Sequence, residues 1–170
     1  MHLNGGIGMF CYQKATLEDL ERSWDREIRE NPDDRRYLRW KDQFLTANQS
    51  GRAATFLVLE NTVPVGQGTL LFDPDARAVA GYPCLCDGRQ TANVNTLRIE
   101  KRLEGQGHIS NLMKQLESYA MEMGITRLTI GVEAAESRNL AIYLHWGYTE
   151  FLMAREDKGT LVLYYGKDLE

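Results

Sequence analysis

The residues best suited to hold an anionic group form the segment Glu-Gly-Gln-Gly-His-Ile at positions 104–109. Two glycines there allow the backbone to approach a ligand closely. The segment joins a predicted strand to a long predicted helix, and the free amides at a helix N-terminus attract phosphate. A pyrophosphate-binding turn is one interpretation, and a tight strand-to-helix turn without a ligand is the other. The spacing is not that of a dinucleotide-binding fingerprint or a P-loop.

The cysteines give no sign of a metal site or of a covalent nucleophile. Cys84 and Cys86 are one residue apart, and neither a second Cys pair nor a His pair lies at ligand spacing. With Cys11 the number of cysteines is odd, which argues against a secreted disulfide framework. The sequence therefore predicts reduced cysteines, a cytoplasmic protein and no metal.

Composition and charge exclude several classes of protein. The chain has 170 residues, 43% of them hydrophobic, and a formal net charge of −4. These values suit one folded domain rather than a disordered chain. A nucleic-acid-binding protein usually carries a basic excess, and no apolar run is long enough to cross a bilayer, so neither partner is predicted. Mild acidity favours a cationic acceptor such as an amine.

Hydrophobic periodicity and turn residues predict one α/β domain over residues 9–170, preceded by a Gly-rich, disordered lead-in over residues 1–8. Two amphipathic helices are expected after Thr16 and after Asn31-Pro32, because these residues favour helix starts. The order is strand, two helices, three strands, helix, strand, helix and two strands. The later expected elements are strands over 54–60, 64–72, 91–100, 127–132, 148–154 and 160–165, and helices over 105–123 and 137–146.

Two segments resemble signatures of the GNAT superfamily of N-acetyltransferases. Residues 104–113 resemble the acetyl-CoA motif, in which a glycine-rich turn opens the helix after the central strand. The segment Tyr-Leu-His-Trp-Gly-Tyr at positions 143–148 is similar to a second signature, with Tyr148 where Phe is usual. The hairpin at Val65-Gly66 and the order of the elements also resemble the family over nearly the whole chain.

The sequence departs from the family pattern at three positions. Glu104 stands where Arg or Gln is usual, Ile109 replaces a small residue, and Glu136 replaces an Asn that often precedes the later helix. Asn139 lies one turn further on. The backbone N–H of Ile109 can still donate, so the departures leave the strength of cofactor binding open.

The resemblance implies a single GNAT-like domain with a mixed, mostly antiparallel central sheet and helices on both faces. Acetyl-CoA would enter a V-shaped split between two parallel strands as a co-substrate. Backbone groups near Leu97, Ile99 and Lys101 would pair with its pantetheine arm as an added strand does. The residues that would hold the rest of the cofactor are Gly105, Gln106, Gly107, His108, Ile109, Ser110 and Asn139.

The implied reaction moves an acetyl group to a primary amine of a small molecule or peptide by direct attack in a ternary complex. The amine must lose a proton, the carbonyl oxygen needs a donor, and the departing thiolate needs a proton. The resemblance makes Tyr143 the general acid, the alternative being a core aromatic. Glu100, at the end of the central strand, is the first candidate for the base and Glu133 the second. A solvated carboxylate is the alternative role for Glu100.

Other functions stay open from the sequence alone. A non-catalytic acyl-CoA-binding or sensing module would keep the motif without turnover. A tRNA-acting toxin acetyltransferase predicts a basic surface, which the net charge of −4 opposes. A dinucleotide-binding or flavodoxin-like protein predicts more alternating βαβ units. The final hairpin would also let two copies pair across a two-fold axis as a homodimer.

Overall fold

The computed structural model describes residues 8–170, so the predicted disordered lead-in lies, apart from Gly8, outside the described residues. The elements follow the order and types that the sequence predicts, with one added 3-10 helix, η1. Their bounds are β1 (Phe10–Lys14), α1 (Leu17–Glu30), α2 (Arg36–Gln49), β2 (Ala53–Glu60), β3 (Val63–Leu71), β4 (Thr91–Ile99), η1 (Lys101–Leu103), α3 (His108–Glu122), β5 (Arg127–Glu133), α4 (Ser137–His145), β6 (Glu150–Asp157) and β7 (Thr160–Asp168).

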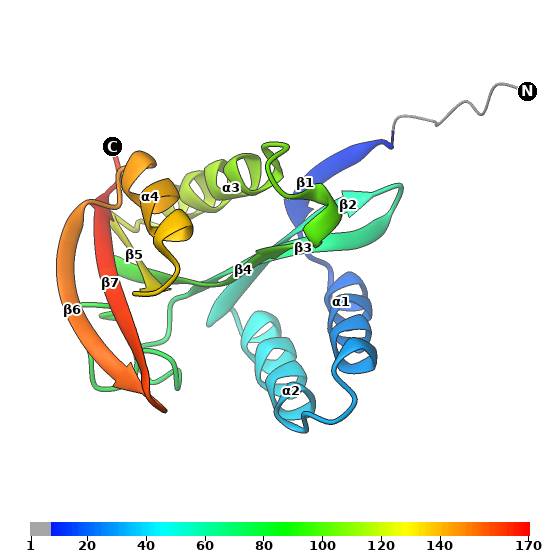
Figure 1. The fold of residues 1–170 in the computed structure, drawn as a ribbon, viewed down its shortest axis with the longest axis horizontal. Coiled ribbons are helices and arrows are strands. Elements are labelled where there is room, and N and C mark those ends of the chain that lie inside the picture. Colours follow the sequence, from blue (N-terminus) through cyan, green and yellow to red (C-terminus); the bar gives the residue numbers. More distant parts are fainter. Residues whose placement is uncertain (1–7) are drawn as a thin grey trace, which may run out of the picture.

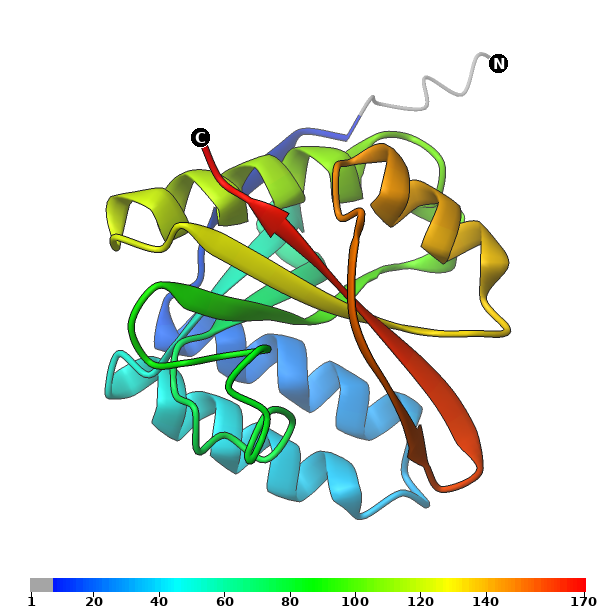
Figure 2. The same ribbon diagram turned by 90° about the vertical axis from the view of Figure 1, so that its left-hand side faces the viewer.

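Within residues 8–170 the strands form a seven-stranded sheet in the order β1-β2-β3-β4-β5-β7-β6. β4 and β5 are parallel, and the other neighbouring pairs in this part of the chain are antiparallel. Helices α3 and α4 cover one face, and α1 and α2 cover the other (Figures 1 and 2). The prediction of a single α/β domain with a mixed, mostly antiparallel sheet and helices on both faces is confirmed.

The third long helix begins later than the sequence pattern predicts. It starts at His108 rather than at Gly105, because Gly105 and Gly107 have φ angles of +74° and +86°. A right-handed helix cannot contain these left-handed conformations, which glycine adopts without a steric penalty. The glycines therefore build a turn in front of the helix rather than its first residues.

The main core lies between α3 and the sheet. Leu112, Met113, Leu116 and Ala120 of α3 are all buried against it, as their helical spacing predicts. Full burial of such a leucine stabilises the fold by about 2 kcal/mol. A Cβ at Gly68 of β3 would lie 2.8 Å from a methyl of Leu116 and 2.9 Å from one of Leu97 on β4. This close contact holds α3 against β3, next to β4.

Candidate functional site

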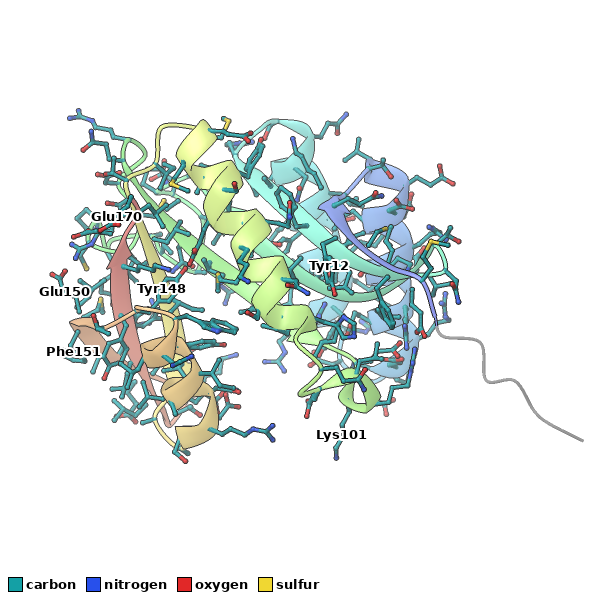
Figure 3. All side chains as sticks on the ribbon, turned by 90° about the horizontal axis from the view of Figure 1, so that it is seen from above. Tyr12, Lys101, Tyr148, Glu150, Phe151 and Glu170 are labelled. Atoms are coloured by element: carbon teal, nitrogen blue, oxygen red, sulfur yellow. The ribbon has the colours of Figure 1, made fainter. Side chains whose placement is uncertain are left out.

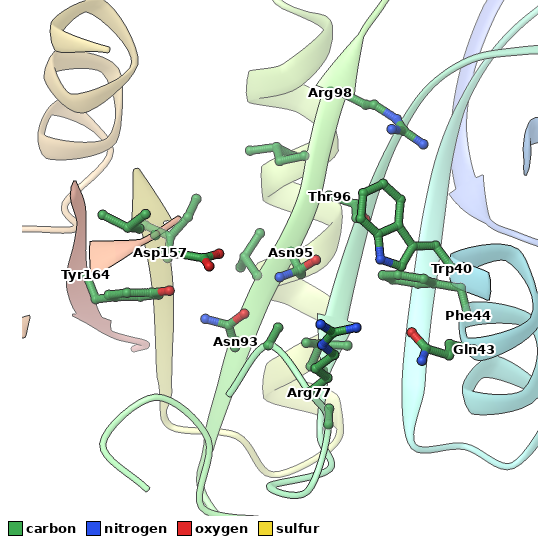
Figure 4. A pocket seen from close by; sticks show the side chains of 18 of the residues that line it. Trp40, Gln43, Phe44, Arg77, Asn93, Asn95, Thr96, Arg98, Asp157 and Tyr164 are labelled. Carbon is green, nitrogen blue, oxygen red and sulfur yellow. The ribbon is translucent and has the colours of Figure 1, made fainter. Parts of the chain in front are cut away.

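The parallel strands β4 and β5 pair over only half of their length. Thr91–Val94 pair with Arg127–Ile130, and beyond this point β4 continues on β3 to Ile99 while β5 continues on β7. Figure 4 shows the two strands diverging beyond Asn93. The facing edges of residues 95–99 and 131–133 therefore carry backbone N–H and C=O groups without a strand partner. Such groups need hydrogen bonds, and an extended ligand would provide them.

The hydrogen-bond register shows which groups of β4 face this split. The N–H of Glu100 donates to the carbonyl of Val65 (2.9 Å), and Ile99 lies opposite Gly66. Residues of an antiparallel ladder alternate in direction, so the backbone groups of Arg98 face β3 and those of Leu97 and Ile99 face away from it. Leu97 and Ile99, both predicted from the resemblance, thus present backbone donors and acceptors to the split.

Lys101 differs from these two residues. It begins η1, and its carbonyl already accepts the N–H of Glu104 (3.2 Å). Its side chain is exposed and projects from the turn in front of α3 (Figure 3). The backbone of Lys101 therefore belongs to the turn before α3 and does not extend the free edge of β4.

A β-bulge lies in β4 at the point where the split opens. Thr96 has a φ of +49°, which is unfavourable for a β-branched residue, and the register with β3 shifts here. Its hydroxyl donates to Thr69 (3.2 Å), which shares a hydrogen bond with Thr55 (2.8 Å), and Thr55 accepts from Asn48 of α2 (3.0 Å). This chain of side chains holds the bulge, and strained backbone held in this way is typical of functional sites.

The N-terminus of α3 offers free backbone donors beside the split. Gly107 is the N-cap residue, and within this fully described helix the first turn carries no acidic side chain and the cap makes no side-chain hydrogen bond. The N–H groups of His108, Ile109 and Ser110 have no partner inside the helix. A Cβ at Gly105 or Gly107 would meet no atom of residues 8–170 within 4 Å. Open space and unpaired amides suit a pyrophosphate.

The side chain of His108 has a different role from its N–H. Nδ1 shares a hydrogen bond with the hydroxyl of Tyr12 (2.8 Å), and the ring packs against Phe10 at 4.3 Å between centroids. Figure 3 shows Tyr12 beside α3. The side chain thus anchors the helix to β1 and leaves its first amides free. Gln106 also turns back on the loop and donates to the carbonyl of Arg102 (3.2 Å).

A cavity of about 1330 Å³ passes through the split from α4 to α2. Tyr143 and Asn139 of α4 line one end, and the Asn139 amide donates to Glu136 (2.9 Å). Burial, together with the charge of Glu136, raises the pKa of Tyr143 to about 12, so its hydroxyl keeps its proton at neutral pH. Tyr148 holds this end in place, since its N–H donates to the carbonyl of Tyr143 (3.0 Å).

The two candidate bases lie in different places. Glu100 forms ion pairs with Arg26 and with Arg102, and it lines a smaller pocket of about 210 Å³ between α1 and β4. Glu133, at the free end of β5, lines the large cavity together with Tyr143. The structure therefore brings Glu133 into the same cavity as Tyr143, while the carboxylate of Glu100 is engaged with two arginines outside it.

The opposite end of the cavity contains residues that the sequence did not single out as functional. Figure 4 shows Asn93 and Asn95 of β4, Gln43 of α2, Arg77 of the loop before β4, and Tyr164 of β7 around it. Arg155 of β6 lines the same region. These residues come from segments far apart in the chain, so no local spacing marks them. Helix α2 and the loop between β3 and β4 both contribute side chains to this end of the cavity.

Neither a metal cluster nor a membrane helix is found in the described part of the chain. Among residues 8–170 no group of three His, Cys, Asp or Glu side chains is placed to bind a metal ion. None of the described helices combines the length and apolar character that crossing a bilayer requires.

These features define an α/β protein in which two parallel strands splay apart beside a helix that follows a glycine turn. The family model of the acetyltransferase (GNAT) family matches residues 14–148. The chain belongs to the GNAT family of acetyltransferases. No curated protein matches its sequence.

Solved structures with this fold share little sequence with the chain. An N-acetyltransferase from Staphylococcus aureus Mu50 is 16% identical, with a TM-score of 0.69 over 95% of this chain and 99% of its own. The ribosomal-protein-S18-alanine N-acetyltransferase from Escherichia coli is 15% identical, with a TM-score of 0.69 over 95% of each chain. The yncA protein of Salmonella typhimurium, solved with its cofactor acetyl-CoA, is 15% identical, with a TM-score of 0.68 over 95% of this chain and 94% of its own.

Proposed function

We propose that the protein is an acetyl-CoA-dependent N-acetyltransferase that acts on a primary amine of a small molecule or peptide by direct attack in a ternary complex. The observation that carries this proposal is the pair of unpaired strand edges in front of the free N-terminus of α3. Backbone groups of Leu97 and Ile99 suit the amides of a pantetheine arm, and the amides of residues 105–110 suit its pyrophosphate. A structural neighbour that acetylates an alanine of a ribosomal protein supports an amine acceptor.

Acetyl-CoA, when bound, supplies a thioester whose carbonyl carbon exchanges its bond to sulfur for a bond to the amine nitrogen. Tyr143 donates its hydroxyl proton to the departing sulfur and regains one from solvent. Because burial raises the pKa of Tyr143 to about 12, the hydroxyl still holds its proton when the bond to sulfur breaks. An N–H group on the free edge of β4 would donate to the carbonyl oxygen as negative charge develops there.

The proton of the attacking amine goes to Glu133, directly or through water, and from there to solvent. Of the two carboxylates that the sequence proposes as bases, Glu133 lines the cavity and Glu100 does not. Glu100 instead orients Arg26, whose guanidinium also donates to the carbonyl of Pro64 (3.0 Å) at the start of β3. It is a structural anchor for α1 in this proposal.

The test is release of CoA thiol from acetyl-CoA in the presence of a panel of primary amines: amino acids, dipeptides, polyamines and aminoglycosides. We expect amine-dependent release with at least one class and none with the corresponding N-acetylated compounds. Tight acetyl-CoA binding with a silent panel would instead favour a non-catalytic acyl-CoA-binding module.

A further inference from the structure

Arg155, on β6, lines the end of the cavity that α2 and the loop before β4 form, and it has no ionic partner among residues 8–170. We call this end the acceptor end, because the amine would approach the split from it. Its Nη2 donates to the hydroxyl of Tyr164 (2.7 Å) and to the carbonyl of Ala78 (3.2 Å). The guanidinium also lies over the rings of Tyr82 and Tyr164, at 5.0 and 5.4 Å from their centroids. These contacts fix the group rigidly against the loop and β7.

The three nitrogen atoms of the Arg155 guanidinium differ in their hydrogen-bond partners. Nη2 has two acceptors, and Nε is buried without an acceptor in residues 8–170. Nη1 has no hydrogen bond to the described residues and is not among their buried, unsatisfied atoms, so it is open to the cavity that Arg155 lines. A guanidinium presents donors in a planar fork that suits a carboxylate.

Other partly buried arginines of the protein have carboxylate partners. Arg26 pairs with Glu30 and Glu100, Arg98 pairs with Glu27, and Arg127 pairs with Asp168 and Glu150. Within residues 8–170 no Asp or Glu pairs with Arg155. Partial burial of a cation costs free energy unless a partner compensates it. The missing partner therefore points to a ligand.

A second free arginine lies at the same end of the cavity. Arg77 is exposed, has no ion-pair partner in the described part of the chain, and precedes Ala78, whose carbonyl Arg155 holds. Figure 4 shows its side chain directed toward Asn93 and Asn95. Asn93 donates to Thr129 (3.0 Å), which leaves its carbonyl oxygen free. This end of the cavity thus combines two guanidinium groups with neutral amides.

Among residues 8–170, none of the carboxylates that line the cavity forms an ion pair with Arg77 or Arg155. Asp73, on the loop, lies 3.6 Å from Arg52 instead. The others are Asp42, Asp75, Glu133, Glu136, Glu156 and Asp157. A cationic acceptor such as a polyamine would place a second positive charge against Arg77 and Arg155. An acceptor with an acid group would instead meet both guanidinium groups.

We propose that the acceptor amine carries a carboxylate, which Arg155 and Arg77 bind, so that the amine is directed toward the split. This proposal rests on the proposed function and narrows its substrate class to amino acids and to peptides with an acidic group close to the amine. The net charge of −4 favoured a cationic acceptor. This proposal predicts an acceptor with an acidic group instead, because the substrate meets the two arginines at this end of the cavity rather than the net charge of the whole chain.

The test compares each amino acid with its own carboxamide as acceptor for the full-length protein. The kcat/KM for CoA release should be at least about tenfold higher for the acid, which corresponds to one charge-assisted pair. In Arg155→Gln this preference should disappear, because the kcat/KM for the acid falls to that for the amide through a higher KM for the acid. Equal use of acid and amide by the wild type would overturn the proposal, as would a preference that survives in the variant.

Further variants separate specificity from folding. Arg155 also packs between two rings, so Arg155→Lys keeps the charge and should retain part of the preference. Arg77→Gln changes an exposed residue and should lower the preference without altering the Tm. Dipeptides whose second residue is Asp or Glu should also be compared with dipeptides whose second residue is Asn or Gln. This comparison shows whether the arginines bind a side-chain carboxylate or the free C-terminal carboxylate.

A binding measurement keeps this proposal distinct from the proposed function. Calorimetry with CoA present should show the amino acid binding more tightly than its amide, and the difference should vanish in Arg155→Gln. If no amine is acetylated but this difference is found, the N-acetyltransferase assignment fails and the carboxylate site stands. If amines are acetylated without such a difference, the carboxylate site fails alone.

Discussion

The candidate site has two ends, which are built from different parts of the polypeptide. At the end beside the N-terminus of α3 the donors are backbone groups: the free edge of β4 and the amides after Gly105 and Gly107. At the α2 end they are side chains, among them Arg77, Arg155 and Asn95, which come from a loop and two strands. A backbone-built site depends on where strands separate and helices begin. A side-chain-built site can change its ligand by substitution without changing the fold.

The largest expected effect is at Tyr143, the proposed general acid, which lines the cavity from α4. Tyr143→Phe should lower kcat by about 100-fold or more, since it removes the general acid and leaves the packing of the ring. The Kd of acetyl-CoA should stay within about twofold, because the site that holds it is backbone. Tyr119→Phe is the matched control, as that hydroxyl accepts from Lys14 (3.2 Å) away from the cavity. Equal losses in both variants would remove Tyr143 from the mechanism.

The next comparison concerns the two candidate bases. Glu133→Gln should lower kcat near neutral pH by about tenfold or more and restore it partly as pH rises and the amine loses its own proton. Glu100→Gln should leave kcat within about twofold and cost about 1 kcal/mol of unfolding free energy, because it weakens the pairs with Arg26 and Arg102. pH–rate profiles and urea melts of both variants check this. A selective kcat loss in Glu100→Gln would reverse the assignment.

A pair of glycines at opposite ends of α3 tests whether the backbone-built end holds the cofactor. Gly107 and Gly124 have φ of +86° and +81°, and at neither would a Cβ meet an atom of residues 8–170 within 4 Å. Alanine at either position should cost about 1 kcal/mol of stability, from the left-handed conformation. Only Gly107→Ala should raise the Kd of acetyl-CoA, by about tenfold, because it disturbs the turn that aims the amides. Equal acetyl-CoA Kd values for the two variants in calorimetry would show that this turn does not take part in cofactor binding.

The smallest expected effect is on stability at high pH. An unfolded tyrosine has a pKa near 10, and burial raises that of Tyr143 to about 12. As pH rises from 10 to 12 the unfolded chain loses its proton first, so the free energy of unfolding falls by up to about 1.4 kcal/mol per pH unit. Tyr143→Phe should lack this part of the fall. Urea melts at pH 8, 10 and 11 measure the difference, and parallel curves would contradict the burial of this hydroxyl.

The contrast between the two ends also explains what the sequence could predict. The glycine-rich turn and the helix after it are local, because the need for left-handed backbone and the apolar spacing of Leu112 and Leu116 fall within a few residues. The fold order followed from similar patterns. The predicted start of this helix was three residues too early, because the pattern of apolar residues does not show which glycines have a positive φ.

The acceptor end could not be predicted in this way. Arg155 and Ala78 are 77 positions apart, and only the folded sheet and loop bring them into contact. The same is true of Glu100 and Arg26, whose ion pair shows that a carboxylate at a strand end already has a partner. Neither the net charge nor a short motif shows which charged residues, far apart in the sequence, pair with one another in the folded protein.

The most direct test of the central claim is a calorimetric titration of the wild-type protein with acetyl-CoA, with NAD and ATP as controls. We expect saturable, micromolar binding of acetyl-CoA and no heat from either control, because in the proposed site the split binds a pantetheine arm and the α3 turn binds the pyrophosphate joined to it. Absence of acetyl-CoA binding, or equal binding of NAD or ATP, would contradict it.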